Sequence, residues 1–147
     1  MMKIYTIGFT QKTAQEFFTL LSRNGIQRLV DIRLKPSGQL SGFAKKEDLP
    51  FFLERLASGC GYVHLPELAP TQEILEEYRA SKDWLRYAER FEALMDSRGI
   101  PASLQRDEFE KVSNCLLCSE ASPDHCHRRL VAERMAAFWP EVEIIHL

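Results

Sequence analysis

The chain has 147 residues, of which 45% are hydrophobic and 27% are charged, and its formal net charge is -2. This composition is typical of a folded protein with one hydrophobic core and excludes an intrinsically disordered chain, while the charge argues against a strongly basic nucleic-acid-binding domain. No apolar run approaches the roughly 18 residues of a membrane span, and no signal-peptide core is present, so we expect no membrane association. Four cysteines without export signals predict free thiols in a reducing compartment, and hence a cytoplasmic protein.

The first part of the chain alternates strand-like runs with a helix. Residues 3–8 are rich in β-branched and aromatic side chains and predict a strand, and residues 28–32 predict a second one. Between them, Thr13 is expected to cap a helix that Asn24 and Gly25 end.

The middle of the chain is mostly helical. Residues 33–43 predict a loop because they contain proline, glycine and serine. Residues 48–56 predict a helix and residues 61–65 a third strand. Thr71 is expected to begin another helix, and residues 83–97 carry hydrophobic side chains at helical spacing after an aspartate that can cap them.

The last part of the chain contains the segment with the most reactive side chains. Residues 103–111 predict a short helix, residues 114–118 a fourth strand and residues 142–147 a terminal strand. Ser122 as the cap and Pro123 as the first helical residue predict the start of the last long helix.

Strands separated by helices favour an α/β fold, which we predict to be a single domain over residues 1–147. It would be a sandwich with a largely parallel central sheet of about five strands, flanked by helices. Ligands on such sheets bind beyond the carboxyl ends of the strands. That edge would carry Thr6 and Gly8, the pair Asp31 and Arg33, and the loop that follows the fourth strand. Asp31 and Arg33 either form a local ion pair, or Arg33 and the loop amides near Ser37 present themselves to an anion.

Residues 115–129 hold three of the four cysteines and two of the four histidines. Cys126 would lie in the first turn of the last helix, where the helix dipole and the nearby arginines would lower its thiol pKa. Cys118 would face the same region from the end of its strand. The two thiols permit nucleophilic catalysis, disulfide formation or metal binding. The alternative is that both are buried packing residues.

Two specific chemistries fit this segment poorly. Cys115 and Cys118, with the ligands at residues 125–127, could supply four zinc ligands, but positions three apart in a strand point to opposite faces. The sequence therefore argues against zinc and requires no cofactor. A phosphatase-type loop places an arginine shortly after its cysteine, whereas Arg128 follows Cys118 by ten residues.

Five motifs together resemble the domain-of-unknown-function family 488, small bacterial and archaeal proteins with no settled activity. The motifs are Tyr5-Thr-Ile-Gly8, Leu29-Val-Asp-Ile-Arg33, Pro36-Ser37 with Phe43, Tyr62-x-His64-Leu-Pro-x-Leu68, and Leu117-Cys118-x-Glu120 leading to Cys126-His127-Arg128. The resemblance runs over nearly the whole chain and implies a compact α/β domain. The polar residues that it marks are Asp31, Arg33, Cys118, Glu120, Cys126, His127 and Arg128.

The sequence departs from the family pattern at two places. Gly8-Phe9-Thr10 replaces the usual Gly-His-Ser, so no mechanism here can use a histidine at that position. Leu68-Ala69-Pro70 replaces Leu-Gly-Gly, which predicts a stiffer and more crowded loop.

The leading hypothesis is a cysteine-assisted hydrolase or transferase that acts on a phosphate-bearing ligand, either a nucleotide or a nucleic-acid end. The candidate catalytic residues are Cys118, Glu120, Cys126 and His127. The candidate ligand-binding residues are Thr6, Gly8, Asp31, Arg33, Ser37 and Arg128, with Arg33 and Arg128 as the anion clamp. Two alternatives stay open: a non-catalytic module that binds nucleotides or nucleic acid through the same arginines, and a thiol redox sensor that uses Cys118 and Cys126.

Overall fold

A computed structural model describes residues 1–147, and its centre is a five-stranded sheet in which every neighbouring pair of strands is parallel. The strands are β1 (Met2–Gly8), β2 (Arg28–Asp31), β3 (Gly61–His64), β4 (Asn114–Cys118) and β5 (Val142–His146). Their order across the sheet is β3-β2-β4-β1-β5. The predicted α/β fold with a parallel central sheet is confirmed, and the predicted strands agree with the observed ones to within one residue at each end.

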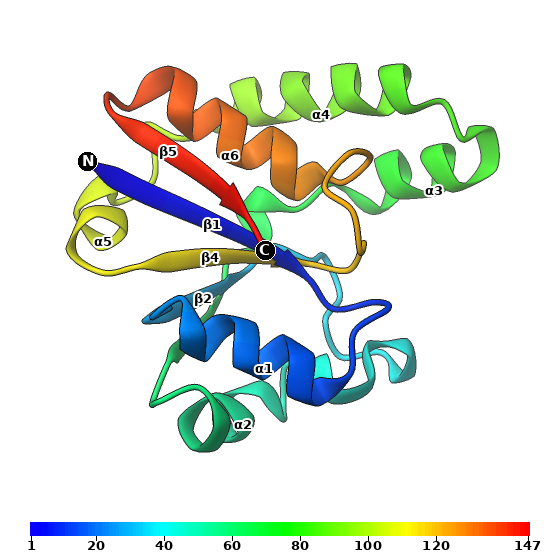
Figure 1. Ribbon diagram of the computed structural model, residues 1–147. Coiled ribbons are helices and arrows are strands. Elements are labelled where there is room, and N and C mark those ends of the chain that lie inside the picture. The colour runs from blue at the N-terminus through cyan, green and yellow to red at the C-terminus, as the bar shows by residue number, and fades with distance from the viewer.

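Helices cover both faces of the sheet (Figure 1). The helices are α1 (Ala14–Arg23), α2 (Leu49–Leu56), α3 (Gln72–Ser81), α4 (Trp84–Arg98), α5 (Arg106–Lys111) and α6 (His127–Phe138), with 3-10 turns at Gln39–Ala44 and Pro66–Leu68. In Figure 1, α1 and α2 lie below the sheet, whereas α3, α4 and α6 lie above it. None of these helices combines the length and the apolar character that a membrane span requires.

The alternation of side chains along the strands divides the core into two halves. Ile4 of β1 and Leu116 of β4 pack under α4 and α6, and their neighbours Tyr5 and Leu117 pack on α1 and α2. Successive strand residues point to opposite faces, which produces this division. All five residues of β4 are buried, as expected for a central strand of a parallel sheet that is covered on both faces.

Three helices begin where the sequence predicts. Thr13, Thr71 and Asp83 each accept a hydrogen bond from the backbone N–H three residues further on, at the starts of α1, α3 and α4. This contact satisfies one of the N–H groups that the first helical turn leaves without a partner.

Two helices begin later than predicted. Residue 103 caps no helix, and α5 begins at Arg106. Ser122 and Pro123 do not start α6, which begins at His127. The Ser122 hydroxyl accepts from the backbone N–H of Asp124 and closes a local turn instead. Arg128 of α6 holds the carbonyl oxygens of Glu120 and Ala121, residues 121–126 form bends and a turn, and Cys126 directly before the helix is extended, with φ -134° and ψ 137°.

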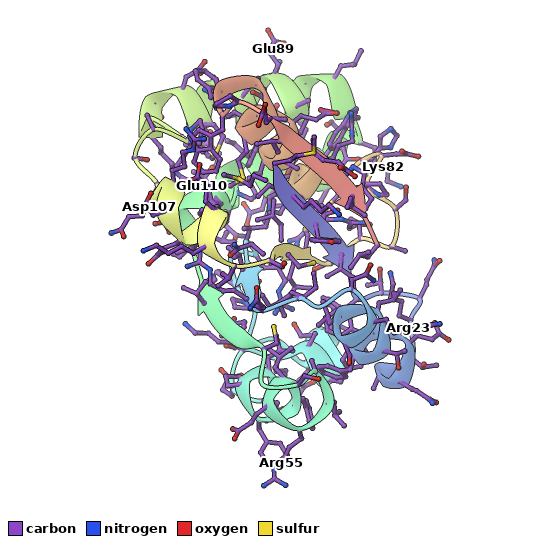
Figure 2. The ribbon with its side chains drawn as sticks, turned by 60° about the vertical axis from the view of Figure 1, so that its left-hand side comes forward. Arg23, Arg55, Lys82, Glu89, Asp107 and Glu110 are labelled. Atoms are coloured by element: carbon purple, nitrogen blue, oxygen red, sulfur yellow. The ribbon has the colours of Figure 1, made fainter.

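Charged side chains on the outer surface are exposed, whereas two arginines at the sheet edge are buried. In Figure 2, the labelled side chains Arg23, Arg55, Lys82, Glu89, Asp107 and Glu110 project away from the ribbon, and all are exposed. Arg33 and Arg128 are instead buried near the carboxyl ends of the strands. Burial of a guanidinium is costly unless it is paired and hydrogen-bonded, so these two arginines require dedicated partners.

Candidate functional site

The carboxyl ends of the central strands meet beside one cavity. Gly8 at the end of β1 pairs with Cys118 at the end of β4, and Asp31 of β2 lies beside Leu117. A cavity of about 340 Å³ opens next to these ends, lined by the loops after β2 and β4 and by side chains of α3. This is the place at which open parallel sheets bind ligands.

Cys118 and His127 form a hydrogen-bonded pair on the cavity wall. Cys118 is the last residue of β4, and its Sγ lies 3.4 Å from Nδ1 of His127, the first residue of α6. The other ring nitrogen, Nε2, lies 2.7 Å from the carbonyl oxygen of Ile32. Because a carbonyl oxygen only accepts, Nε2 must carry a hydrogen, which leaves Nδ1 facing the thiol.

Neighbouring donors favour ionisation of Cys118. The pKa of Cys118 is lowered chiefly by a hydrogen bond from Cys126, then by the backbone N–H groups of Ser119 and Glu120 and by the charge of Arg128, all against the opposing effect of burial. The same hydrogen bond and burial raise the pKa of Cys126. Cys118 therefore ionises first, and Cys126 stays a protonated donor to it.

This arrangement corrects the prediction for Cys126. The sequence placed Cys126 in the first helical turn with a lowered thiol pKa. In the structure it precedes α6 and its pKa is raised. The reason is the contact with Cys118, since two close thiols cannot both ionise readily and the one with more donors does so first.

Arg128 holds the loop after β4 against β1. Its side chain has no exposed surface, and its Nε donates to the hydroxyl of Thr6 over 3.2 Å. Its other nitrogens donate to the carbonyl oxygens of Glu120 and Ala121. These contacts satisfy a buried cation with fixed acceptors, so Arg128 shapes the cavity wall from behind without lining it.

Gly8 is the point of closest approach between β1 and this loop. A Cβ at Gly8 would lie 1.6 Å from the carbonyl oxygen of Glu120 and 2.8 Å from Nη1 of Arg128. We expect Gly8→Ala to lower the free energy of unfolding by about 1–3 kcal/mol or more, as overpacking does, because backbone must move. Thermal or urea denaturation measures this.

The matched control is Gly38→Ala. Gly38 has an ordinary φ of -69°. Nothing lies within 4 Å of a Cβ there, so we expect a change within about 0.5 kcal/mol. Equal stabilities of the two variants would contradict the close packing of the loop on Gly8.

Asp31 and Arg33 form a buried ion pair with two parallel hydrogen bonds. The Nε–Oδ1 distance is 2.8 Å and the Nη2–Oδ2 distance is 2.7 Å. Arg33 also donates to the carbonyl oxygen of Ala44, and the Tyr62 hydroxyl donates to Asp31. Burial, together with this hydrogen bond to Asp31, raises the pKa of Tyr62 and keeps its hydroxyl a donor. Of the two interpretations of Asp31 and Arg33, the ion pair is the one observed.

The two departures from the family pattern also lie at this site. The Phe9 ring centroid lies 5.3 Å from the guanidinium carbon of Arg33, and the ring packs edge-on against Phe43. An aromatic face thus replaces a polar ring beside the ion pair. Ala69 is fully buried, and Pro70 lines the cavity.

The candidate catalytic residues all line the cavity, whereas only one of the candidate ligand-binding residues does. Cys118, Glu120, Cys126 and His127 all line the cavity. Arg33 lines it as well. The residues outside the lining are Thr6, Gly8, Asp31 and Arg128, which are buried behind it, and Ser37, which is exposed on the loop after β2. Contact of these five with a ligand stays a prediction, and four of them support the wall.

Sequence reasoning missed the cations and rings that face the cavity. Lys35 lies on the loop after β2, and Tyr78 and Arg79 lie on α3; all three line the cavity. Lys35 and Arg79 are exposed, and neither takes part in an ion pair. Burial raises the pKa of Tyr87, which therefore adds a neutral hydroxyl. The helical spacing of residues 72, 75 and 79 on one face was the available signal.

Comparisons with known proteins return one family and no characterised relative. Residues 13–135 match the family model described as Domain of unknown function DUF488. The match includes the Asp31-x-Arg33 motif and the segment from Cys118 to Arg128, and it begins after the Tyr5–Gly8 motif. No curated protein and no solved structure matches the chain.

Proposed function

This chain belongs to the family described as Domain of unknown function DUF488, and we propose that it is a cysteine-dependent hydrolase or transferase for a phosphate-bearing ligand. The observation that carries the proposal is the alignment of Cys118, His127 and the Ile32 carbonyl oxygen on the cavity wall. A nucleophile beside a base that a third group orients is the common arrangement of nucleophilic catalysis.

The proposed reaction has two steps. The Cys118 thiolate attacks an electrophilic atom of the ligand, and the bond from that atom to the leaving group breaks. The leaving group takes the proton that Nδ1 of His127 has removed from the Cys118 thiol. Water, or an acceptor hydroxyl, then attacks the same atom and passes its proton to Nδ1, and the bond to sulfur breaks. The Ile32 carbonyl oxygen keeps the ring in place throughout.

The charges of the cavity support an anionic ligand. Lys35, Arg79 and Arg33 line it against one carboxylate, that of Glu120. Lys35 and Arg79 have no ion-pair partner, so we assign to them the anion-binding role that was predicted for Arg128. Tyr78 and Tyr87 add aromatic surface beside them, which supports a ligand that carries a nucleobase as well as a phosphate.

The test is ligand binding by Lys35→Ala and Arg79→Ala variants. We expect each to weaken the affinity for a nucleotide or a short single-stranded oligonucleotide by about fivefold or more, equal to roughly 1 kcal/mol per lost charge contact. Isothermal titration calorimetry over a panel of these ligands measures the change.

Arg23→Ala is the matched control, because Arg23 is exposed on α1 and does not line the cavity. Affinities that are equal in all three variants would refute the anion-binding role. A Cys118→Ser variant that binds and turns over its ligand normally would remove Cys118 as the nucleophile, whereas binding without any turnover by the unmodified protein would favour the non-catalytic module.

The thiol redox sensor is the second candidate function. It is favoured by the position of the two sulfurs of Cys118 and Cys126, which lie within 4.8 Å of each other and form no disulfide. A low-pKa thiolate next to a second thiol is the usual arrangement of a cysteine that peroxide oxidises and a neighbour that resolves it. Mass spectrometry after mild peroxide treatment decides whether the disulfide forms.

A further inference from the structure

Three buried side chains at the cavity place potential metal-ligand atoms close together. The thiols of Cys118 and Cys126 and a ring nitrogen of His127 all lie within 4.8 Å of one another. These residues are 5%, 2% and 6% exposed. Cys115, the fourth ligand that the sequence offered for zinc, instead packs in the core under α1 and α2. We infer that Cys118, Cys126 and His127 form a Zn²⁺-binding site that does not use Cys115.

The distances suit a tetrahedral ion. With Zn–S bonds of about 2.3 Å and Zn–N bonds of about 2.0–2.1 Å, tetrahedral ligands lie about 3.6 Å apart for sulfur and nitrogen and about 3.8 Å apart for two sulfurs. The observed distance from Cys118 Sγ to His127 Nδ1 is 3.4 Å. The other ligand atoms lie within 4.8 Å of one another, so the two sulfurs need to approach by at most about 1 Å to bind a tetrahedral ion.

The outer contact of His127 is the one that zinc ligands commonly have. Its Nε2 donates to the Ile32 carbonyl oxygen over 2.7 Å, which directs Nδ1 toward the two sulfurs. Such a contact selects the tautomer and holds the ring in its ligating orientation. The site is thus oriented before the ion arrives.

Charge balance also suits a doubly charged cation. Metal binding displaces the thiol protons, so the two thiolates of Cys118 and Cys126 and a neutral imidazole neutralise Zn²⁺. A neutral centre is acceptable in a buried position, where a net charge would be costly. The cavity leaves the fourth coordination position to water or to a ligand.

The zinc site goes beyond the proposed reaction and excludes it while the ion is bound. A thiolate that ligates zinc cannot act as the free nucleophile, so Zn²⁺ is expected to inhibit any turnover and to protect Cys118 from alkylation. Binding itself requires no turnover, so the two proposals can fail separately.

Titration of the reduced, chelator-treated full chain with Co²⁺ and then Zn²⁺ tests the site. We expect one Co²⁺ per chain with thiolate-to-cobalt charge-transfer absorption, displaced by one Zn²⁺. Cys126→Ser should weaken binding by at least about 100-fold, more than the loss of an outer-shell partner does. Cys60→Ser is the control, because Cys60 is also a buried free thiol but lies outside the site.

A second measurement uses only the unmodified protein, so it does not depend on the folding of a variant. One equivalent of Zn²⁺ should block alkylation of Cys118 by iodoacetamide, and a chelator should restore it. Absence of stoichiometric binding, equal binding by Cys126→Ser and the control, or alkylation unaffected by Zn²⁺ would each overturn the site. If Zn²⁺ fails to bind while Cys118 still reacts as a thiolate, only the metal inference falls.

Discussion

Replacement of Cys126 by alanine is expected to slow alkylation of Cys118 at pH 7 by about tenfold or more. The Cys126 thiol is the main donor that lowers the pKa of Cys118. A hydrogen bond to a charged group contributes about 1.5–3 kcal/mol, and 1.4 kcal/mol corresponds to a tenfold change. The rate is measured by mass spectrometry of the Cys118 peptide after timed exposure to iodoacetamide.

The sign of the pH dependence follows from the lowered pKa. The reactive thiolate of Cys118 is present above its pKa and is lost as the pH falls through it, so the wild-type rate falls at a lower pH than the rate of an ordinary thiol does. Cys126→Ala should move this rate profile to higher pH. Cys60→Ala, at a buried thiol outside the cavity, should leave the profile in place. A profile that does not respond to Cys126 would exclude the thiol–thiolate contact.

Replacement of Asp31 by alanine is expected to lower the free energy of unfolding by about 3–5 kcal/mol. Asp31 has no exposed surface, and Arg33 is 5% exposed, so the change would leave a buried guanidinium without its carboxylate. Removal of one partner of a buried ion pair has an effect of this size because the remaining charge stays desolvated. Urea denaturation followed by circular dichroism measures the loss.

Tyr62→Phe is the matched control for Asp31. It removes one hydrogen bond to the Asp31 carboxylate and leaves both contacts from Arg33, so we expect a loss of only about 1 kcal/mol. A loss of similar size in the two variants would mean that Arg33 finds other partners. In that case the Ala44 carbonyl oxygen and the Ser41 hydroxyl, which already accept from Arg33, would be sufficient.

The position of Arg33 connects this stability to the cavity. Its guanidinium is held by Asp31 and by the Ala44 carbonyl oxygen while it lines the cavity. The ion pair therefore lies between the core and the cavity, with Arg33 on the cavity side. A buried and fully bonded arginine provides a rigid positive surface, whereas Lys35 and Arg79 are exposed cations at the cavity.

Local patterns were sufficient for most elements and insufficient for the starts of α5 and α6. Thr13, Thr71 and Asp83 act as predicted because a helix cap needs only residues close in sequence. Ser122 and Pro123 have the same local pattern, but α6 begins at His127. Arg128 holds the preceding loop against β1, and this contact, distant in sequence, overrides the local preference.

The α/β class, the strands and the set Cys118, Glu120, Cys126 and His127, which lines one cavity, were predictable from the chain alone, because side-chain periodicity and motif spacing are properties of a single segment. The packing of the folded chain determines which thiol ionises first, since that depends on the Cys126 thiol and the loop N–H groups that meet at Cys118. It also decided that Arg128 supports the wall while Arg79 of α3 lines the cavity. Parallel strands bring distant segments to one edge, and a charge buried there takes its role from the partners it meets.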